Sequence, residues 1–217
     1  MSKESIKVLL VDDEQLIRGG LKILLNEFER LEIVGEVKNG REALAFCDQH
    51  RVDIVLMDIR MPEVNGIEGT ELIKKKHPNI KVLILTTFQD VEYISQSMQV
   101  GASGYLLKDS SPEEIYAGIQ IALSDNVVLD GKISQAMLAN TTAQANTAFS
   151  PAAFDLSDKE IEIIRYIASG LNNQEIAGNM FLSVGTIKNN ISMILSKLEL
   201  RDRTQLAIFA FQKGLMN

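Results

Sequence analysis

Short apolar runs alternate with helix-length segments over the first 125 residues. Strand-length runs rich in Val, Ile and Leu occupy residues 6–11, 33–37, 53–57, 81–85 and 104–107. The segments between them carry apolar residues three and four positions apart, the spacing of one face of an α-helix, first at Leu16, Leu21, Leu24, Leu25 and Phe28. This alternation predicts right-handed crossovers and an α/β domain, with a doubly wound five-stranded parallel sheet covered by helices on both faces.

The pattern changes in the second half of the chain. Residues 139–153 are mostly Ala, Thr, Asn, Gln and Ser, with no sustained apolar period, which is typical of a linker. We therefore assign residues 1–125 to the α/β domain and 126–153 to a linker with a candidate short helix around 132–139. Residues 154–217 show only helical spacing, so we expect a small all-α domain there.

Composition agrees with two folded domains and excludes a disordered chain. The 217 residues are 46% hydrophobic and 24% charged. No apolar run reaches the length of a membrane span or resembles a signal peptide, so we expect a cytoplasmic protein without a membrane partner. Cys47 is the only cysteine, which excludes an intrachain disulfide and indicates a small buried apolar residue.

Polar residues follow the carboxyl ends of four predicted strands. Ligands of an open parallel sheet bind outside these ends, where we find Asp12-Asp13, Asp58, Thr86 and Lys108. Three carboxylates at one edge would repel one another, and a bound divalent cation would relieve that repulsion. Oxygen ligands without His or Cys favour Mg²⁺, which would also neutralise charge on an incoming phosphoryl group.

Residues 5–125 resemble the receiver domains of bacterial response regulators. The matching positions are Asp12-Asp13, the segment 56–62 followed by Gly66, Thr86, and Tyr105 to Lys108. The resemblance implies a flavodoxin/CheY-like fold in which Asp58 accepts a phosphoryl group from a sensor histidine kinase. It also implies that Mg²⁺ is bound by Asp13, Asp58 and the backbone carbonyl of Arg60, with Asp12 acting mainly through water.

The remaining residues of the matched site imply a switch. Lys108 would pair with the phosphoryl oxygens, the Thr86 hydroxyl would move to one of them, and Tyr105 would turn inward into the vacated space. The face formed by the fourth helix, fifth strand and fifth helix would then change. That face would either mask the second domain or dimerise. We further expect the Arg60 side chain to overhang the phosphoryl group and alter its lifetime.

The second domain has the sequence pattern of a helix-turn-helix. Ser157 and Glu160 have the spacing of a capping box, a second short helix follows from Asn173, and Ser183 caps a third helix. Helical spacing places the inward residues of that third helix at Ile187, Ile191, Ile194, Leu195 and Leu198. Its outer face then carries Gly185, Lys188, Asn189, Ser192 and Ser196, small polar and basic groups suited to a DNA major groove.

Residues 154–214 resemble the LuxR-type helix-turn-helix of the NarL/FixJ branch of response regulators. The match lies in Leu156 to Glu160, Gly170 to Asn173, Glu175 to Ala177 and Leu182 to Lys188. It implies binding to double-stranded promoter DNA, with RNA polymerase as a further candidate partner. The expected contacts are Lys188, Asn189 and Ser192 on base edges, and Asn190, Thr186 and Arg203 on phosphates. Asn190 stands where the family usually has His, so its contact would be a neutral hydrogen bond.

Charge argues for dimeric binding. Residues 154–217 hold seven Lys/Arg and seven Asp/Glu, so the formal net charge of −7 belongs entirely to residues 1–153. A DNA-binding domain without net positive charge neutralises few DNA phosphates. We therefore expect the phosphorylated protein to form a homodimer, which would supply further contacts with DNA. The last predicted helix, residues 205–213, could contribute a dimer seam through Leu206, Ile208, Phe209 and Phe211.

Two other functions remain as alternatives. An aspartyl-phosphate hydrolase on a similar sheet typically has a second Asp two residues after the nucleophile, where this chain has Arg60. A receiver that works without phosphorylation usually lacks the acceptor, the acidic pair or the lysine, all of which are present here. We therefore predict a transcription regulator that accepts a phosphoryl group and is not a dedicated enzyme.

Overall fold

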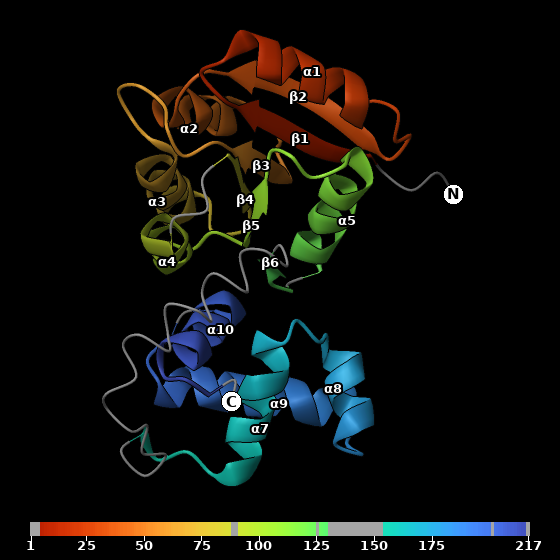
Figure 1. The fold of residues 1–217 in the computed structure, drawn as a ribbon, viewed down its shortest axis with the longest axis vertical. Coiled ribbons are helices and arrows are strands. Elements are labelled where there is room, and N and C mark those ends of the chain that lie inside the picture. Colours follow the sequence, from red (N-terminus) through yellow and green to blue (C-terminus); the bar gives the residue numbers. More distant parts are fainter. Residues whose placement is uncertain (1–4, 88–90, 125, 130–153, 201, 216–217) are drawn as a thin grey trace. The chain divides into compact units, whose positions relative to one another are not determined.

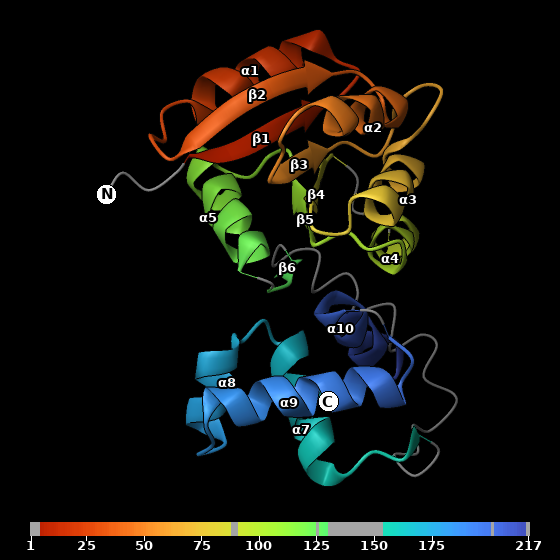
Figure 2. The ribbon, with the colours of Figure 1, turned by 180° about the vertical axis from the view of Figure 1, so that it is seen from behind.

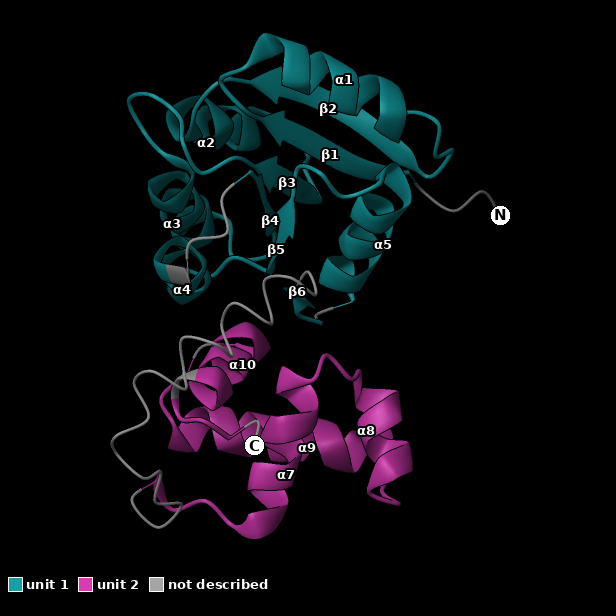
Figure 3. Ribbon diagram, viewed as in Figure 1, with its two compact units in different colours: residues 1–130 teal, residues 131–217 magenta. Residues whose placement is uncertain are grey.

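The computed structural model describes residues 5–87, 91–124, 126–129, 154–200 and 202–215. Contacts divide the chain into two compact units, residues 1–130 and 131–217 (Figure 3). The candidate short helix at 132–139, and the predicted linker beyond residue 129, lie outside the described residues. Within those residues, no helix is both long and apolar enough to cross a membrane.

The first unit is a parallel sheet whose strands alternate with helices. Its elements are β1 (Ile6–Val11), α1 (Gln15–Leu25), β2 (Leu31–Val37), α2 (Gly40–Gln49), β3 (Ile54–Met57), α3 (Gly66–Lys76), β4 (Lys81–Thr86), α4 (Val91–Gln99), β5 (Gly104–Leu107), α5 (Pro112–Leu123) and β6 (Val128–Leu129). The strand order is β2-β1-β3-β4-β5-β6. The five predicted strands are confirmed. The two-residue β6 adds a sixth strand beside β5 and carries the sheet past the predicted boundary at residue 125.

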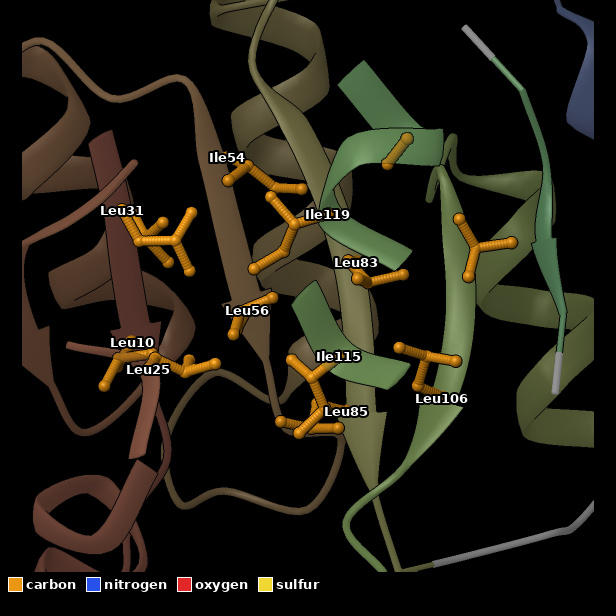
Figure 4. Close-up of a cluster of buried hydrophobic side chains, with 13 residues drawn as sticks. Leu10, Leu25, Leu31, Ile54, Leu56, Leu83, Leu85, Leu106, Ile115 and Ile119 are labelled. Atoms are coloured by element: carbon orange, nitrogen blue, oxygen red, sulfur yellow. The ribbon is translucent and has the colours of Figure 1, made fainter. Parts of the chain in front are cut away.

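Helices cover both faces of this sheet. Figures 1 and 2 show α1 and α5 on one face and α2, α3 and α4 on the other. Alternate strand residues face α1 and α5, and they form with those helices the apolar cluster of Figure 4, which includes Leu10, Leu56, Leu85, Leu106, Leu25, Ile115 and Ile119. All four residues of β3 and of β5 are buried, because a strand with helices on both faces has no solvent side.

The inward face of α1 is narrower than predicted. Leu25 is fully buried, and Leu21 and Phe28 pack against the same cluster. Leu16 is 87% exposed and Leu24 is 43% exposed, so only some of the apolar residues at helical spacing in this segment face the core. At 3.6 residues per turn, Leu16 lies on the side of the helix opposite Leu25.

The second unit consists, as described, of four helices: α7 (Asp158–Ala168), α8 (Asn173–Asn179), α9 (Val184–Lys197) and α10 (Arg203–Gln212). Each begins at a side chain that accepts a backbone N–H bond, at Ser157, Asn172, Ser183 and Asp202. The predicted capping box is confirmed, because Ser157 and Glu160 each accept from the other's backbone.

The last helix fills the core of this unit instead of presenting a broad dimer seam. Leu206, Ile208 and Phe211 are buried, and Phe209 is partly buried with its ring edge-on to Phe154 at 5.3 Å between centroids. The three buried residues are therefore not available for a dimer seam, and the expectation that some residues of this helix form one stays a prediction. A small domain without a sheet needs the apolar circumference of α10 to build its own core.

Cys47 is buried in α2, as predicted, and we expect it to be unreactive. Burial, with a smaller effect of the neighbouring Asp48 carboxylate, raises the pKa of its thiol to about 11. Almost no thiolate then forms at neutral pH, and the thiolate is the reactive species. An aromatic disulfide reagent, followed by absorbance, should label the unfolded protein stoichiometrically and the folded protein hardly at all. Rapid labelling of the folded protein would contradict this assignment.

Candidate functional sites

Two acidic residues come together at the carboxyl ends of β1 and β3. Strand β1 lies between β2 and β3, so the order of the strands in the sheet changes direction at β1. In open parallel sheets, ligands bind at this switch point, outside the carboxyl ends of the strands. The register pairs Val11 with Met57, so Asp12 and Asp58 follow their strands side by side. The Asp58 backbone N–H donates to the Val11 carbonyl at 2.8 Å, which fixes the start of the loop that follows β3.

Three carboxylates converge at this point, as the sequence predicted. One oxygen from each of Asp12, Asp13 and Asp58 lies within 4.8 Å of the others. Asp12 and Asp58 are buried and Asp13 is exposed, so the cluster opens to solvent on one side. Three carboxylates, with no nitrogen or sulfur ligand, fit a hard cation such as Mg²⁺ that keeps some of its water.

Lys108 supplies the positive charge of the site. Its Nζ atom lies 2.6 Å from Asp12 Oδ2 and 3.0 Å from Asp58 Oδ2. Burial alone would lower the pKa of the Lys108 ammonium, but its bonds to the two carboxylates outweigh burial and raise that pKa. The ammonium therefore stays charged at neutral pH and bridges the two carboxylates.

The Asp58 carboxylate is held in place but poorly solvated. Its Oδ1 atom accepts a bond from the Ile59 backbone N–H at 2.8 Å, and Oδ2 faces Lys108. Burial raises the pKa of Asp58, with a smaller contribution from Asp12, and this outweighs the lowering by Lys108 and the Thr86 hydroxyl. The ionised carboxylate is consequently less stable here than in water, and added positive charge would stabilise it.

Thr86 is the last residue of β4, and Tyr105 lies inside the neighbouring strand β5. Both are fully buried. The Thr86 hydroxyl makes no hydrogen bond of good geometry within the described part of the chain, which is costly for a buried donor. Oxygens added at Asp58 would offer it an acceptor. The expected inward turn of the Tyr105 ring upon phosphorylation stays a prediction.

Gly66 packs directly against the backbone of Asp58. A Cβ atom at Gly66 would lie 1.9 Å from the Asp58 carbonyl oxygen and 2.9 Å from the Ile59 Cα. These are backbone atoms that cannot turn away, so the loop between β3 and α3 closes only with glycine at this position. The backbone N–H of Gly66 donates to the Ile59 carbonyl at 2.9 Å, which fastens the same closure.

The Arg60 side chain contacts an aromatic residue of α4, and its expected position over a phosphoryl group on Asp58 stays a prediction. Its guanidinium carbon lies 5.5 Å from the ring centroid of Tyr93 on α4, within the range of a cation–π contact. Sequence reasoning missed Tyr93, because this contact joins a loop to a helix that is distant along the chain. The predicted role of the Arg60 backbone carbonyl as a metal ligand stays a prediction.

A second candidate site is the outer face of α9. Lys188, Asn189 and Ser192 are exposed there, as predicted, and Ile187, Ile191 and Ile194 are buried on the opposite side. The Ser183 hydroxyl caps the helix by accepting from the Thr186 N–H at 3.0 Å. The helix therefore presents one basic and two amide or hydroxyl side chains on a fixed face.

Three predicted phosphate contacts are already engaged within the domain. The Asn190 amide donates to the Thr186 carbonyl at 2.8 Å, and the Thr186 hydroxyl lies 2.8 Å from that of Ser183. Arg203 donates to the Asn173 side chain at 2.6 Å and to the Leu171 carbonyl. Burial lowers the pKa of Arg203 to about 10. The structure thus places Arg203 in the framework that joins α10 to the start of α8, and not on the exposed face of α9.

Comparison with known proteins identifies the family of each domain. Residues 8–120 match the family described as response regulator receiver domain, and residues 155–210 match bacterial regulatory proteins of the luxR family. The chain is 41% identical to the transcriptional regulatory protein LnrK of Bacillus subtilis, across 97% of this chain and 98% of that relative. It is 36% identical to the response regulator protein VraR of Staphylococcus aureus, across 98% and 99% of the two chains.

A solved structure extends the likeness to three dimensions. The crystal structure of response regulator ChrA, from a heme-sensing two-component system, is 29% identical to this chain. The alignment covers 98% of this chain and all of ChrA, with a TM-score of 0.54. The chain therefore belongs to the response regulators in which a receiver domain is joined to a LuxR-type DNA-binding domain, a family of transcription regulators and not of dedicated enzymes.

Proposed function

We propose that Asp58 accepts a phosphoryl group from a sensor histidine kinase, and that this modification controls promoter binding by the C-terminal domain. In this step a carboxylate oxygen of Asp58 bonds to phosphorus as the bond from phosphorus to the kinase imidazole breaks. The observation that supports it best is the set of groups around Asp58. Lys108 lies 3.0 Å away to pair with phosphoryl oxygens, and the buried Thr86 hydroxyl lacks a good acceptor.

Mg²⁺ fits the same site. We propose that Asp13, Asp58 and the backbone carbonyl of Arg60 hold the ion, with Asp12 acting through water, because three carboxylate oxygens converge within 4.8 Å. The ion would offset the negative charge that gathers between the carboxylate and the phosphoryl group. The chain itself supplies Lys108 as a second, permanent positive charge.

Phosphorylation then shifts a population of conformations. The added phosphoryl oxygens attract the Thr86 hydroxyl and the Lys108 ammonium toward Asp58. The Tyr105 ring then turns inward, and this favours a changed conformation of the surface formed by α4, β5 and α5. We propose that this face supports a homodimer in the cytoplasm, which doubles the DNA contacts of a domain whose formal charge is zero. RNA polymerase is a further candidate partner of the DNA-bound dimer.

Acetyl phosphate with Mg²⁺ tests the proposal directly. Intact-mass measurement should show one added phosphoryl group, light scattering should show a higher dimer fraction, and both changes should disappear when EDTA replaces Mg²⁺. Continuous turnover of acetyl phosphate, without accumulation of the modified chain, would favour the hydrolase instead. An unchanged mass would favour a receiver that works without phosphorylation.

Lys188 and Arg203 of the second domain should behave differently when each is replaced by alanine. Lys188→Ala removes an exposed charge from α9, so we expect weaker DNA binding and a free energy of unfolding within about 0.5 kcal/mol of wild type. Arg203→Ala leaves the Leu171 carbonyl and Asn173 without their donor and should lower that free energy by about 2 kcal/mol. Denaturant titration and fluorescence anisotropy on DNA separate the two effects. If both variants have the same free energy of unfolding, the proposed structural role of Arg203 is wrong.

A further inference from the structure

The four described helices of the second unit end in the same type of turn. After each helix one residue has a left-handed backbone: Gly170 (φ 82°), Phe181 (φ 55°), Glu199 (φ 55°) and Gly214 (φ 66°). In each case the next residue is a leucine whose N–H donates back to the last helical turn, and for Phe181 this bond runs from Leu182 to the Ala177 carbonyl at 2.9 Å. This is a Schellman motif, in which glycine is the usual left-handed residue.

Phe181 is unfavourable at this position for two separate reasons. A left-handed backbone is costly for any residue with a Cβ atom, and a bulky residue in this conformation is an outlier. In addition, the Phe181 side chain is 95% exposed, so its ring gains nothing from packing within the domain. Glycine, as at Gly170 and Gly214, would form the same turn without either cost. A strained and exposed aromatic residue points to a contact with another molecule.

The place of Phe181 in the fold indicates what that molecule is. It lies in the turn between α8 and α9, two residues before the Ser183 cap. Val184, in the first turn of α9, is also exposed at 39%. Exposed Lys188 and Ser192 follow at four-residue steps, so the apolar pair is continuous with the proposed DNA-binding face. In a helix-turn-helix, the beginning of the second helix approaches the bases most closely.

We propose that Phe181 is a DNA-contacting residue whose ring packs against apolar surface at the edge of the major groove. The apolar groups available there are the C5-methyl group of thymine and the deoxyribose of the backbone. A contact of this kind adds affinity without positive charge, which suits a domain with equal numbers of acidic and basic residues. The proposal rests on the DNA binding proposed above.

A pair of glycine substitutions separates the ring from the backbone strain. Phe181→Gly removes the aromatic ring and the backbone strain together. Glu199→Gly relieves the same kind of strain at the end of α9 and leaves the aromatic ring of Phe181 in place. Both variants should raise the melting midpoint, by about 4 °C, because glycine accepts the left-handed conformation. Only Phe181→Gly should lose DNA affinity, by about tenfold, which corresponds to one good apolar contact. Phe181→Ala keeps the strain and should lose the affinity alone.

The DNA probe is obtained from the wild-type protein itself. Duplexes are enriched from a random pool on the phosphorylated wild-type chain, and affinities are then measured by fluorescence anisotropy. Replacing thymine by deoxyuridine at single positions removes the C5-methyl group. If one such replacement weakens wild type but not Phe181→Gly, the ring contacts that methyl group; if none does and the Phe181→Gly loss persists, it contacts deoxyribose.

Each of four results would overturn the proposal, and they are distinguishable. If the wild-type chain enriches no duplex, the proposed DNA binding fails together with the role of Phe181. If the wild type binds and Phe181→Gly binds equally well, the DNA binding stands and only the role of Phe181 is lost. A Phe181→Gly variant that keeps its DNA affinity but dimerises less would assign the ring to a protein partner instead. A melting midpoint lowered by Phe181→Gly would show that the ring has a packing role.

Discussion

Asp58→Asn is expected to abolish phosphoryl uptake completely while making the protein more stable at neutral pH. The amide has no ionised oxygen to attack phosphorus, so incubation with acetyl phosphate and Mg²⁺ should leave the intact mass unchanged. Asparagine keeps the size and shape of the side chain, and Lys108 retains Asp12 as a partner at 2.6 Å. No buried charge is therefore left alone by the substitution.

The gain in stability follows from the pKa of Asp58. Burial raises the pKa of this carboxyl above its ordinary value of 3.8, so the folded protein binds the proton more tightly than the unfolded chain does. The stability that this group contributes is complete below its ordinary pKa and is lost as the pH rises through the raised, folded-state pKa. At neutral pH the ionised carboxylate thus lowers the free energy of unfolding. A neutral amide removes that cost.

Calorimetry across pH checks the prediction. The difference in melting temperature between Asp58→Asn and wild type should be largest at neutral pH and should shrink toward acidic pH, where wild-type Asp58 is protonated. Asp13→Asn is the control, because Asp13 is exposed and belongs to the same cluster. The Asp13→Asn variant should still take up a phosphoryl group on Asp58, but at a higher Mg²⁺ concentration than wild type. Its free energy of unfolding should differ from that of wild type by less than about 0.5 kcal/mol. An Asp58→Asn protein that melts below wild type would contradict the explanation.

Gly66→Ala should damage both the fold and the phosphoryl site. Its new methyl group would meet the Asp58 carbonyl oxygen at 1.9 Å, far inside van der Waals contact, and only a backbone shift could relieve the clash. We expect the free energy of unfolding to fall by about 3 kcal/mol, at the upper end of overpacking effects. We also expect slow phosphoryl uptake, because the shifted atoms belong to the acceptor residue itself.

Gly20→Ala provides the matched control. Gly20 lies inside α1, and nothing comes within 4 Å of a Cβ atom placed there. The same chemical change should therefore raise the free energy of unfolding by about 0.5–1 kcal/mol and leave phosphoryl uptake unchanged. Denaturant titration and time-resolved mass measurement compare the two variants. If Gly66→Ala behaves like Gly20→Ala, the close packing of the loop against Asp58 is refuted.

Local rules made much of this protein predictable. The strands are short apolar runs between amphipathic segments, so their order and the polar residues at their ends can be read from the sequence. Asp12, Asp13, Asp58 and Lys108 converge because parallel strands end at one edge of the sheet. Helix starts at Ser157 and Ser183 were equally predictable, since a cap involves atoms only three residues apart.

Contacts between distant segments were decided only by the tertiary structure. Periodicity could not show that Arg60 lies over Tyr93, or that Arg203 is held by the start of α8, because those partners are far away along the chain. The outward position of Leu16 likewise depends on how much of α1 the sheet covers. The sequence by itself determined the order of the elements and the polar residues at the carboxyl ends of the strands. Side-chain partners and exposure were settled by packing, which residue spacing does not encode.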